Sequence, residues 1–257
     1  MEVHLDQLAT WILGFLWPFV RIAAMFSAAP LISARTLPMR VRLVLAVTVT
    51  AVVAPLAGPV PQLDALSPIG VLVIVNQILI GFAMGLALQV GFAVLAVGGQ
   101  LVGASMGLGF ASVVDPQNGV QMPVISQLYF LLGALLFLTL DGHLMIVELV
   151  ARSFVTLPLD TRSITPEQLQ GLALWSGLVF SEGLRLAMPV ILVTLLLNLA
   201  LGVATRTAPQ LNVFSLGFSI TLLLGLSTML LTLGYLVPLF TGVLHRAFEM
   251  ASTLVAA

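Results

Sequence analysis

Residues 99–123, GQLVGASMGLGFASVVDPQNGVQMP, lie between two long apolar segments and decide how the rest of the chain is interpreted. Glycines recur at four-residue spacing in the first part of this stretch, at Gly99, Gly103 and Gly107. Turn signals follow at Asp115-Pro116 and Asn118-Gly119. Lipid cannot hydrogen-bond an irregular backbone, so such a loop in a membrane protein must be buried in protein or line a cavity. The stretch therefore predicts a constriction or plug rather than an enzyme pocket.

The composition places the chain among integral membrane proteins. Of its 257 residues, 60% are hydrophobic and 7% are charged, whereas soluble domains carry roughly 25% charged residues. The formal net charge is -1 and no basic patch is present, which argues against nucleic-acid binding. The chain has no cysteine, which excludes disulfides and Cys-ligated zinc. We therefore expect an all-α, polytopic integral membrane protein in contact with lipid.

Six apolar segments predict about six long or broken helices. A simple membrane span needs about 20 residues, and only the first two segments are near that length. The other segments are longer, so we expect each of them to be tilted, broken or extended beyond the bilayer. The segments run from about Trp11 to Pro30, Val41 to Ala57, Pro68 to Met106, Pro123 to Phe154, Leu172 to Thr205, and Val213 to Leu244 or beyond.

The most hydrophilic linker, residues 157–168, separates a four-segment part from a two-helix hairpin. Its end predicts a helix start, with Thr165 as the cap, Pro166 in the first helical position and Gln168 three residues after the cap. Residues 206–212, RTAPQLN, are expected to form the tight turn of the hairpin.

The positive-inside rule places the Arg-rich loop 30–42 in the cytoplasm. With six crossings, loop 106–122 and turn 206–212 then share that side. The polar positions of the hairpin tip are therefore expected to contact another component at the cytoplasmic base, with simple capping of the two helix ends as the alternative. These positions are Arg206, Pro209, Gln210 and Asn212.

Several charged or polar residues interrupt the apolar segments. Glu148 and Arg152 are spaced to pair on one helix face, as are Glu182 and Arg185. Inside a membrane protein such groups face the interior and find partners. The favoured interpretation is polar contacts between helices or subunits, and a proton relay is the alternative. The candidate contact residues are Arg21, Asp141, His143, Glu148, Arg152, Glu182 and Arg185.

The loop itself carries candidate sealing residues. Met106, Phe110 and Met122 supply apolar bulk, and methionine adapts to irregular gaps. In an average protein these three would be core residues, and a gating role is the second interpretation. The full set of candidate plug or gate residues is Met106, Gly107, Gly109, Phe110, Asp115, Pro116 and Met122.

Catalytic motifs are absent from the sequence. The chain contains no HExxH, Walker or GxSxG motif, and its three histidines are far apart. We therefore expect no enzyme activity, no catalytic residue, no cofactor and no metal.

Short motifs that are typical of one protein family follow one another along nearly the whole chain. They are Arg21 with Ala29-Pro30, Pro38, Arg42, Gly99-Gln100, Asp115-Pro116, Asp141-Gly142-His143, Leu201-Gly202, Arg206, Pro209-Gln210, Asn212, Phe214 and Gly217. Each motif alone is weak, but their order, the chain length and the segment layout together are specific. In these features the chain resembles the FliR/SctT family of flagellar and virulence export-gate proteins.

The resemblance implies a FliP-like helical part at residues 1–160, which holds the plug loop 106–122, and a FliQ-like helical hairpin at residues 161–257. It implies a single copy in a cone-like hetero-oligomer with FliP-type and FliQ-type proteins, beside an FlhB-type switch protein. Unfolded export substrates would cross the bacterial inner membrane through this gate at the flagellar basal body. Part of the assembly would be raised toward the periplasm, and the loop would help to seal the pore.

A secondary transporter of a small solute is the main alternative. That architecture predicts inverted repeats with broken helices at corresponding positions of two halves. The chain instead shows four segments followed by two, without such symmetry.

Overall fold

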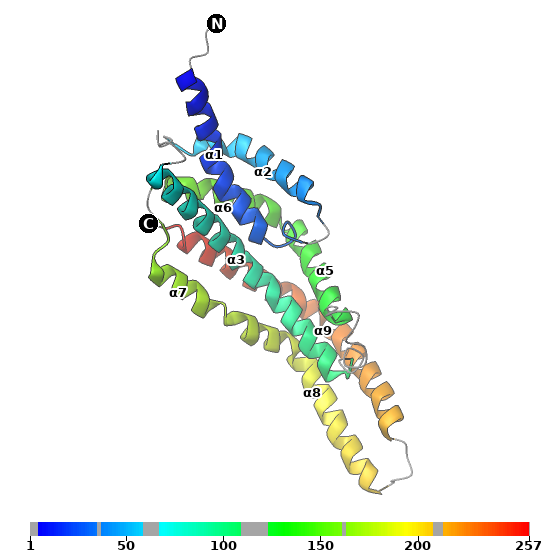
Figure 1. The fold of residues 1–257 in the computed structure, drawn as a ribbon. Coiled ribbons are helices and arrows are strands. Elements are labelled where there is room, and N and C mark those ends of the chain that lie inside the picture. Colours follow the sequence, from blue (N-terminus) through cyan, green and yellow to red (C-terminus); the bar gives the residue numbers. More distant parts are fainter. Residues whose placement is uncertain are drawn as a thin grey trace. The chain divides into compact units, whose positions relative to one another are not determined.

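The structure is a computed structural model that describes residues 5–34, 37–58, 67–108, 123–160, 163–207 and 213–256, with only the backbone for residues 5–12, 207 and 213–216 (Figure 1). Within these ranges the chain is helical and contains no strand. The helices are α1 (Leu5–Ala28), α2 (Met39–Val53), the short 3-10 helix η1 (Ala54–Leu56), α3 (Pro68–Ser105), α5 (Val124–Thr139), α6 (Gly142–Thr156), α7 (Pro166–Trp175), α8 (Leu178–Thr207) and α9 (Val213–Thr253).

The helices coincide with the predicted apolar segments. Among the residues that the structure describes, 4 helices are long and apolar enough to cross a membrane, and 5 spans result if the bent pair α5–α6 counts as one. The prediction of an all-α, polytopic membrane protein is thereby confirmed.

The later segments are longer or more broken than a plain span, as predicted. Helix α3 has 38 residues and α9 has 41. At 1.5 Å per residue these helices measure about 57 and 61 Å, whereas the hydrocarbon core of a bilayer is about 30 Å thick. Neither helix can therefore lie wholly within the hydrocarbon as a perpendicular span.

The fourth segment is broken at Asp141. Helices α5 and α6 meet there at an angle of 66°. Asp141 has a φ of 56°, in the left-handed region that Asp tolerates better than most residues. Its carbonyl oxygen accepts hydrogen bonds from the amides of Leu144 and Met145 in the first turn of α6. The Asp-Gly-His triplet is therefore the point at which one helix ends and the next begins.

The predicted start of α7 is confirmed as a capping box. The Thr165 hydroxyl oxygen accepts a hydrogen bond from the Gln168 amide at 3.3 Å, and the Gln168 side-chain oxygen accepts one from the Thr165 amide at 2.9 Å. The Gln168 side-chain nitrogen also donates to the carbonyl oxygens of Thr253 and Ala256. The cap thus ties the start of α7 to the end of α9.

Contacts divide the chain into two compact units, which we describe separately. The first unit comprises residues 1–90, 137–176 and 244–257. Its core includes a close, parallel packing of α1 on α3, because Gly81 lies against Arg21 and Ala24 while Gly85 lies against Met25 and Ala28. Glycines spaced four residues apart allow such an approach of two backbones. Helix α2 packs against α1 within the same unit.

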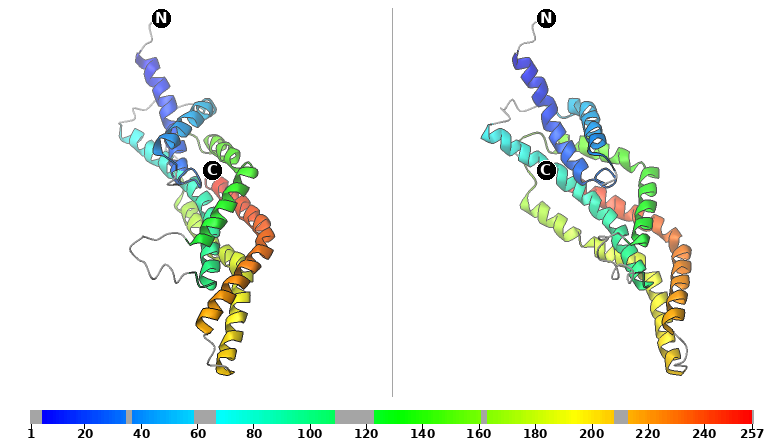
Figure 2. Two further views of the ribbon diagram at one scale, coloured as in Figure 1. Left: turned by 90° about the vertical axis from the view of Figure 1, so that its right-hand side faces the viewer. Right: turned by 45° about the vertical axis from the view of Figure 1, so that its right-hand side comes forward.

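The second unit comprises residues 91–136 and 177–243. The Phe92 ring lies edge-on to Phe130 at 5.7 Å and to Phe240 at 5.2 Å, between ring centroids. Gly98 of α3 packs against Gly183 and Leu186 of α8. Helix α8 and the first half of α9 lie side by side as a hairpin in both views of Figure 2.

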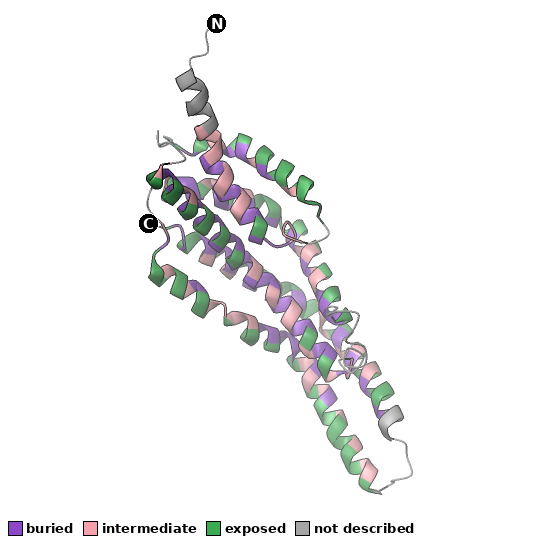
Figure 3. Cartoon of the chain, viewed as in Figure 1, coloured by how far each residue is buried: buried purple, intermediate pink, exposed green. Residues whose placement is uncertain are grey.

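Many residues of the helices are exposed (Figure 3), and a large set of them are apolar. Only 17% of the residues in the Met39–Leu56 segment are buried, and 22% in the most apolar window of each of the segments Pro166–Arg206 and Gly217–Thr253. Exposed side chains on the hairpin include Leu196, Leu199 and Leu231. Water would solvate this surface poorly, so lipid or other proteins must cover it.

Candidate functional site

The end of α3, where the predicted plug loop begins, is fixed by a specific hydrogen-bond pattern. The Leu108 amide donates to the Gly103 carbonyl oxygen at 2.9 Å, and the Gly107 amide donates to the Ala104 carbonyl oxygen at 3.0 Å. Gly107 has a φ of 81°. This is a Schellman motif, in which a glycine in the left-handed conformation stops the helix. Gly107 therefore has a structural role of its own as the C-terminal cap of α3.

The two ends of the loop lie side by side within the second unit. A methyl group on Gly99 would collide with the backbone of Ser126 at the start of α5, so only glycine permits this approach. The Ser126 hydroxyl donates to the Ala96 carbonyl oxygen at 2.9 Å. One turn further on, a methyl group on Gly103 would lie 3.9 Å from the Pro123 Cβ atom, which is ordinary contact. The chain therefore leaves α3 and returns at almost the same place.

Only part of the predicted plug falls in the described residues. Met106 is 0% exposed, and its amide donates to the Val102 carbonyl oxygen at the last turn of α3. The candidates Gly109, Phe110, Asp115, Pro116 and Met122 lie outside the described residues. The sealing role of the set stays a prediction.

Arg21 is the centre of a buried polar cluster in the first unit. Arg21 is 0% exposed. Its guanidinium donates hydrogen bonds to the Gln77 side-chain oxygen at 2.7 Å, to the Ser153 carbonyl oxygen at 2.8 Å and to the Leu157 carbonyl oxygen at 2.9 Å. The guanidinium also lies 4.4 Å from the centre of the Phe154 ring. One side chain thereby joins α1, α3, the end of α6 and the chain beyond it.

The partners of Arg21 could not be predicted from the sequence. Arg21 is 56 residues from Gln77 and 132 from Ser153, and its charge also interacts with Asp160. Spacing along one helix reports only neighbours three or four residues apart. A sequence search for local partners therefore could not find a cluster built from distant segments.

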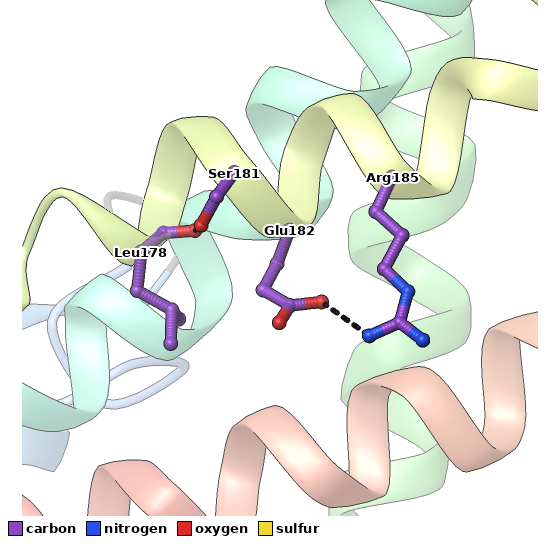
Figure 4. Close-up of polar contacts among 4 residues, drawn as sticks. All are labelled: Leu178, Ser181, Glu182 and Arg185. Atoms are coloured by element: carbon purple, nitrogen blue, oxygen red, sulfur yellow. Dashed lines mark hydrogen bonds and ion pairs between the residues drawn. The ribbon is translucent and has the colours of Figure 1, made fainter.

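The two predicted pairs on single helices form ion pairs with different surroundings. Arg152 lies 2.6 Å from Glu148, and their side chains are 77% and 58% exposed. Arg185 lies 3.8 Å from Glu182, and only the glutamate is buried, at 11% side-chain exposure against 65% for the arginine (Figure 4). Asp141 and His143 are exposed at the helix break. Contacts of these residues with other subunits stay predictions.

The hairpin tip is described only on one side. Arg206 is exposed in the last turn of α8, whereas Pro209, Gln210 and Asn212 lie outside the described residues. Throughout the part of the chain that the structure describes, no group of three or more His, Asp and Glu side chains is placed to hold a metal ion.

Comparison of the sequence with known proteins shows the family to which the chain belongs. The family model described as bacterial export proteins, family 1, matches residues 12–247. The chain belongs to this family. The Flagellar biosynthetic protein FliR of Pectobacterium carotovorum subsp. carotovorum is 42% identical over 250 residues, which cover 97% of this chain and 94% of that protein. The protein of the same name from Escherichia coli (strain K12) is 36% identical over 256 residues, covering 100% and 98%.

More distant FliR relatives extend the comparison to other bacteria. FliR of Bacillus subtilis (strain 168) is 26% identical over 246 residues, which cover 95% of both chains. The resemblance to the FliR/SctT family is thereby confirmed, and the relatives named here are flagellar proteins. Within this FliR family, the relatives are named as flagellar biosynthetic proteins rather than as enzymes.

Proposed function

We propose that this chain is the FliR-type subunit of a flagellar protein-export gate. FliP-type and FliQ-type proteins complete a cone-like pore in the bacterial inner membrane, at the flagellar basal body and partly raised toward the periplasm. Unfolded export substrates cross the membrane through this pore. The chain is present once, with residues 1–160 in a FliP-like role and residues 161–257 as a FliQ-like hairpin.

The observation that carries this proposal, beside family membership, is the exposed apolar surface of very long helices. Helices of about 57 and 61 Å extend beyond a bilayer of about 30 Å, yet they stay apolar and open, with Leu231 of α9 87% exposed. Outside the hydrocarbon this surface needs protein to cover it. Hetero-oligomeric partners of similar helical form supply that cover.

The sealing role of loop 106–122 is supported by its setting. The loop departs from a capped helix end and returns to the tightly packed start of α5. Because both ends of the loop are held by helix contacts, the loop between them can occupy one defined position in a pore. Apolar side chains such as Met122 and Phe110 can then seal that place by excluding water and ions.

The hairpin tip supports a contact with an FlhB-type switch protein. Arg206 is exposed at the end of α8, and the positive-inside argument places the tip at the cytoplasmic base. A crosslinker attached at Asn212→Cys is expected to capture the switch protein from the cytoplasmic side. Labelling from the periplasmic side alone would contradict this placement.

One measurement separates this proposal from a secondary transporter of a small solute. We expect the chain to accumulate poorly when expressed alone and to accumulate well with FliP-type and FliQ-type proteins, because its apolar surface then has partners. Membrane levels of a tagged chain, with and without the partner genes, are the measurement. A stable, monodisperse chain without partners would favour the transporter.

A further inference from the structure

The side chain of Met106, at the C-terminal end of α3, packs into the space beside Gly225 of α9, and we call this space the seat of Met106. A methyl group built on Gly225 would lie 2.6 Å from the Met106 Cγ atom and 3.1 Å from both its Sδ and Cε atoms. Real Cβ atoms do not approach other atoms as closely as 2.6 Å. The missing side chain at position 225 is therefore what makes room for Met106, which is 0% exposed.

The close approach at Gly225 is not shared by other glycines of the α8–α9 hairpin such as Gly202 and Gly234. Around Gly234, on the same helix, a methyl group would meet no atom of the described residues within 4 Å, and the same holds for Gly202 of α8. Most glycines in these helices thus leave open space beside them or serve other crossings. Gly225, unlike Gly234 and Gly242 of α9, receives the side chain of Met106.

Met106 stands directly before the residue that stops α3. Gly107 takes the left-handed conformation with a φ of 81°, and the Met106 amide is still bonded within the helix, to Val102 at 3.1 Å. A side chain held at this position holds the helix end itself. Methionine suits such a seat because its unbranched thioether chain fits irregular gaps.

We propose that Gly225 is a positioning residue through which α9 holds the end of α3. The seat of Met106 on Gly225 couples the α8–α9 hairpin to the point where the chain leaves α3, so that the two move together. Its consequence for export rests on the proposed function, because only a gate subunit would need this helix end to be held in place.

The contact is tested directly by a disulfide, because the natural chain contains no cysteine. In a Met106→Cys/Gly225→Cys variant, the sulfur at position 106 takes the place of the Met Cγ atom, 2.6 Å from the Cβ position of residue 225. The two cysteines are thereby close enough to form a disulfide. We expect oxidation of the assembled complex to remove both thiols from labelling by a maleimide. The matched control is Met106→Cys/Gly234→Cys, whose second site lies about 13 Å further along the helix. Equal labelling of the two variants after oxidation would overturn the proposal.

The coupling is tested by exchanging volume between the two positions. Gly225→Ala overfills the seat and is expected to lower secretion of flagellar proteins and motility, whereas Gly234→Ala is expected to leave both unchanged. Adding Met106→Ala to Gly225→Ala frees the space again and is expected to restore secretion. Such rescue would not occur if Gly225→Ala acted through a contact other than the one with Met106. Normal secretion by Gly225→Ala, or no recovery in the double variant, would overturn the positioning role.

The two tests also separate this proposal from the proposed function. Disulfide formation depends only on the geometry of α3 and α9, and it does not require that the complex be an export gate. If the disulfide forms in a complex that exports nothing, the proposed function fails and the seat of Met106 stands. If it does not form in a complex that exports normally, the seat fails and the gate stands.

Discussion

At the residue scale, a buried arginine shows how this chain uses a charge inside an apolar core. Arg21 makes charge-assisted hydrogen bonds to Gln77, Ser153 and Leu157 from three different parts of the first unit. Removing such a group leaves several buried acceptors unpaired, which costs more than the loss of an exposed contact. Arg152 offers the contrast, since its partner Glu148 and its own side chain are mostly exposed.

The comparison of these two arginines gives a matched prediction. We expect Arg21→Met to destabilise the fold by about 3–5 kcal/mol, as is typical when one partner of a buried charged network is removed. Arg152→Met is expected to cost about 0–1 kcal/mol, because exposed ion pairs contribute little. The midpoint of thermal unfolding of the purified complex is the measurement. Similar midpoints for the two variants would contradict the structural role of Arg21.

The end of α3 gives a second prediction at this scale. Gly107→Ala places a side chain in the left-handed conformation and is expected to cost about 1–2 kcal/mol. Gly103→Ala, one turn earlier, meets only ordinary contacts at 3.9 Å and is expected to be neutral or stabilising by about 0.5–1 kcal/mol. Unfolding of the complex in detergent compares them. A Gly107→Ala complex as stable as the wild type would remove the argument for a fixed helix end.

At the scale of elements, apolar patterning predicts helices well and their long-range contacts poorly. The sequence located the helical segments and the capping box at Thr165, because each depends on neighbouring residues. It did not single out the fourth segment as the one that is broken. It assigned Gly107 to the plug loop, whereas the structure also uses it to cap α3. The partners of Arg21 and the seat of Met106 on Gly225 depend on residues far apart in the chain. No periodicity along one helix encodes such contacts.

The loop between α3 and α5 carries the prediction for this scale. We expect deletion of residues 110–116 to leave the complex assembled but leaky to ions, because the apolar seal is lost while the helix ends stay packed. Phe110→Ala is expected to leak less, since neighbouring methionines partly refill the space. Ion conductance of cells that make the whole complex is the measurement. Unchanged permeability of an assembled deletion complex would leave residues 106–122 as a structural connector.

At the scale of the whole molecule, the chain has the surface of a component rather than of an independent protein. A buried polar cluster around Arg21 holds the first unit together from within, while long apolar helices stay open on the outside. Family membership places it among bacterial export proteins. The proposed role as a subunit of a larger gate would use both features.

The composition of the assembled complex tests this account most directly. Native mass spectrometry of the tagged chain, purified in mild detergent from cells that make the flagellar export proteins, gives the partners and copy numbers in one measurement. The account predicts one copy of this chain bound to several copies of FliP-type and FliQ-type proteins. A stable monomer, or an assembly of this chain with itself alone, would contradict it.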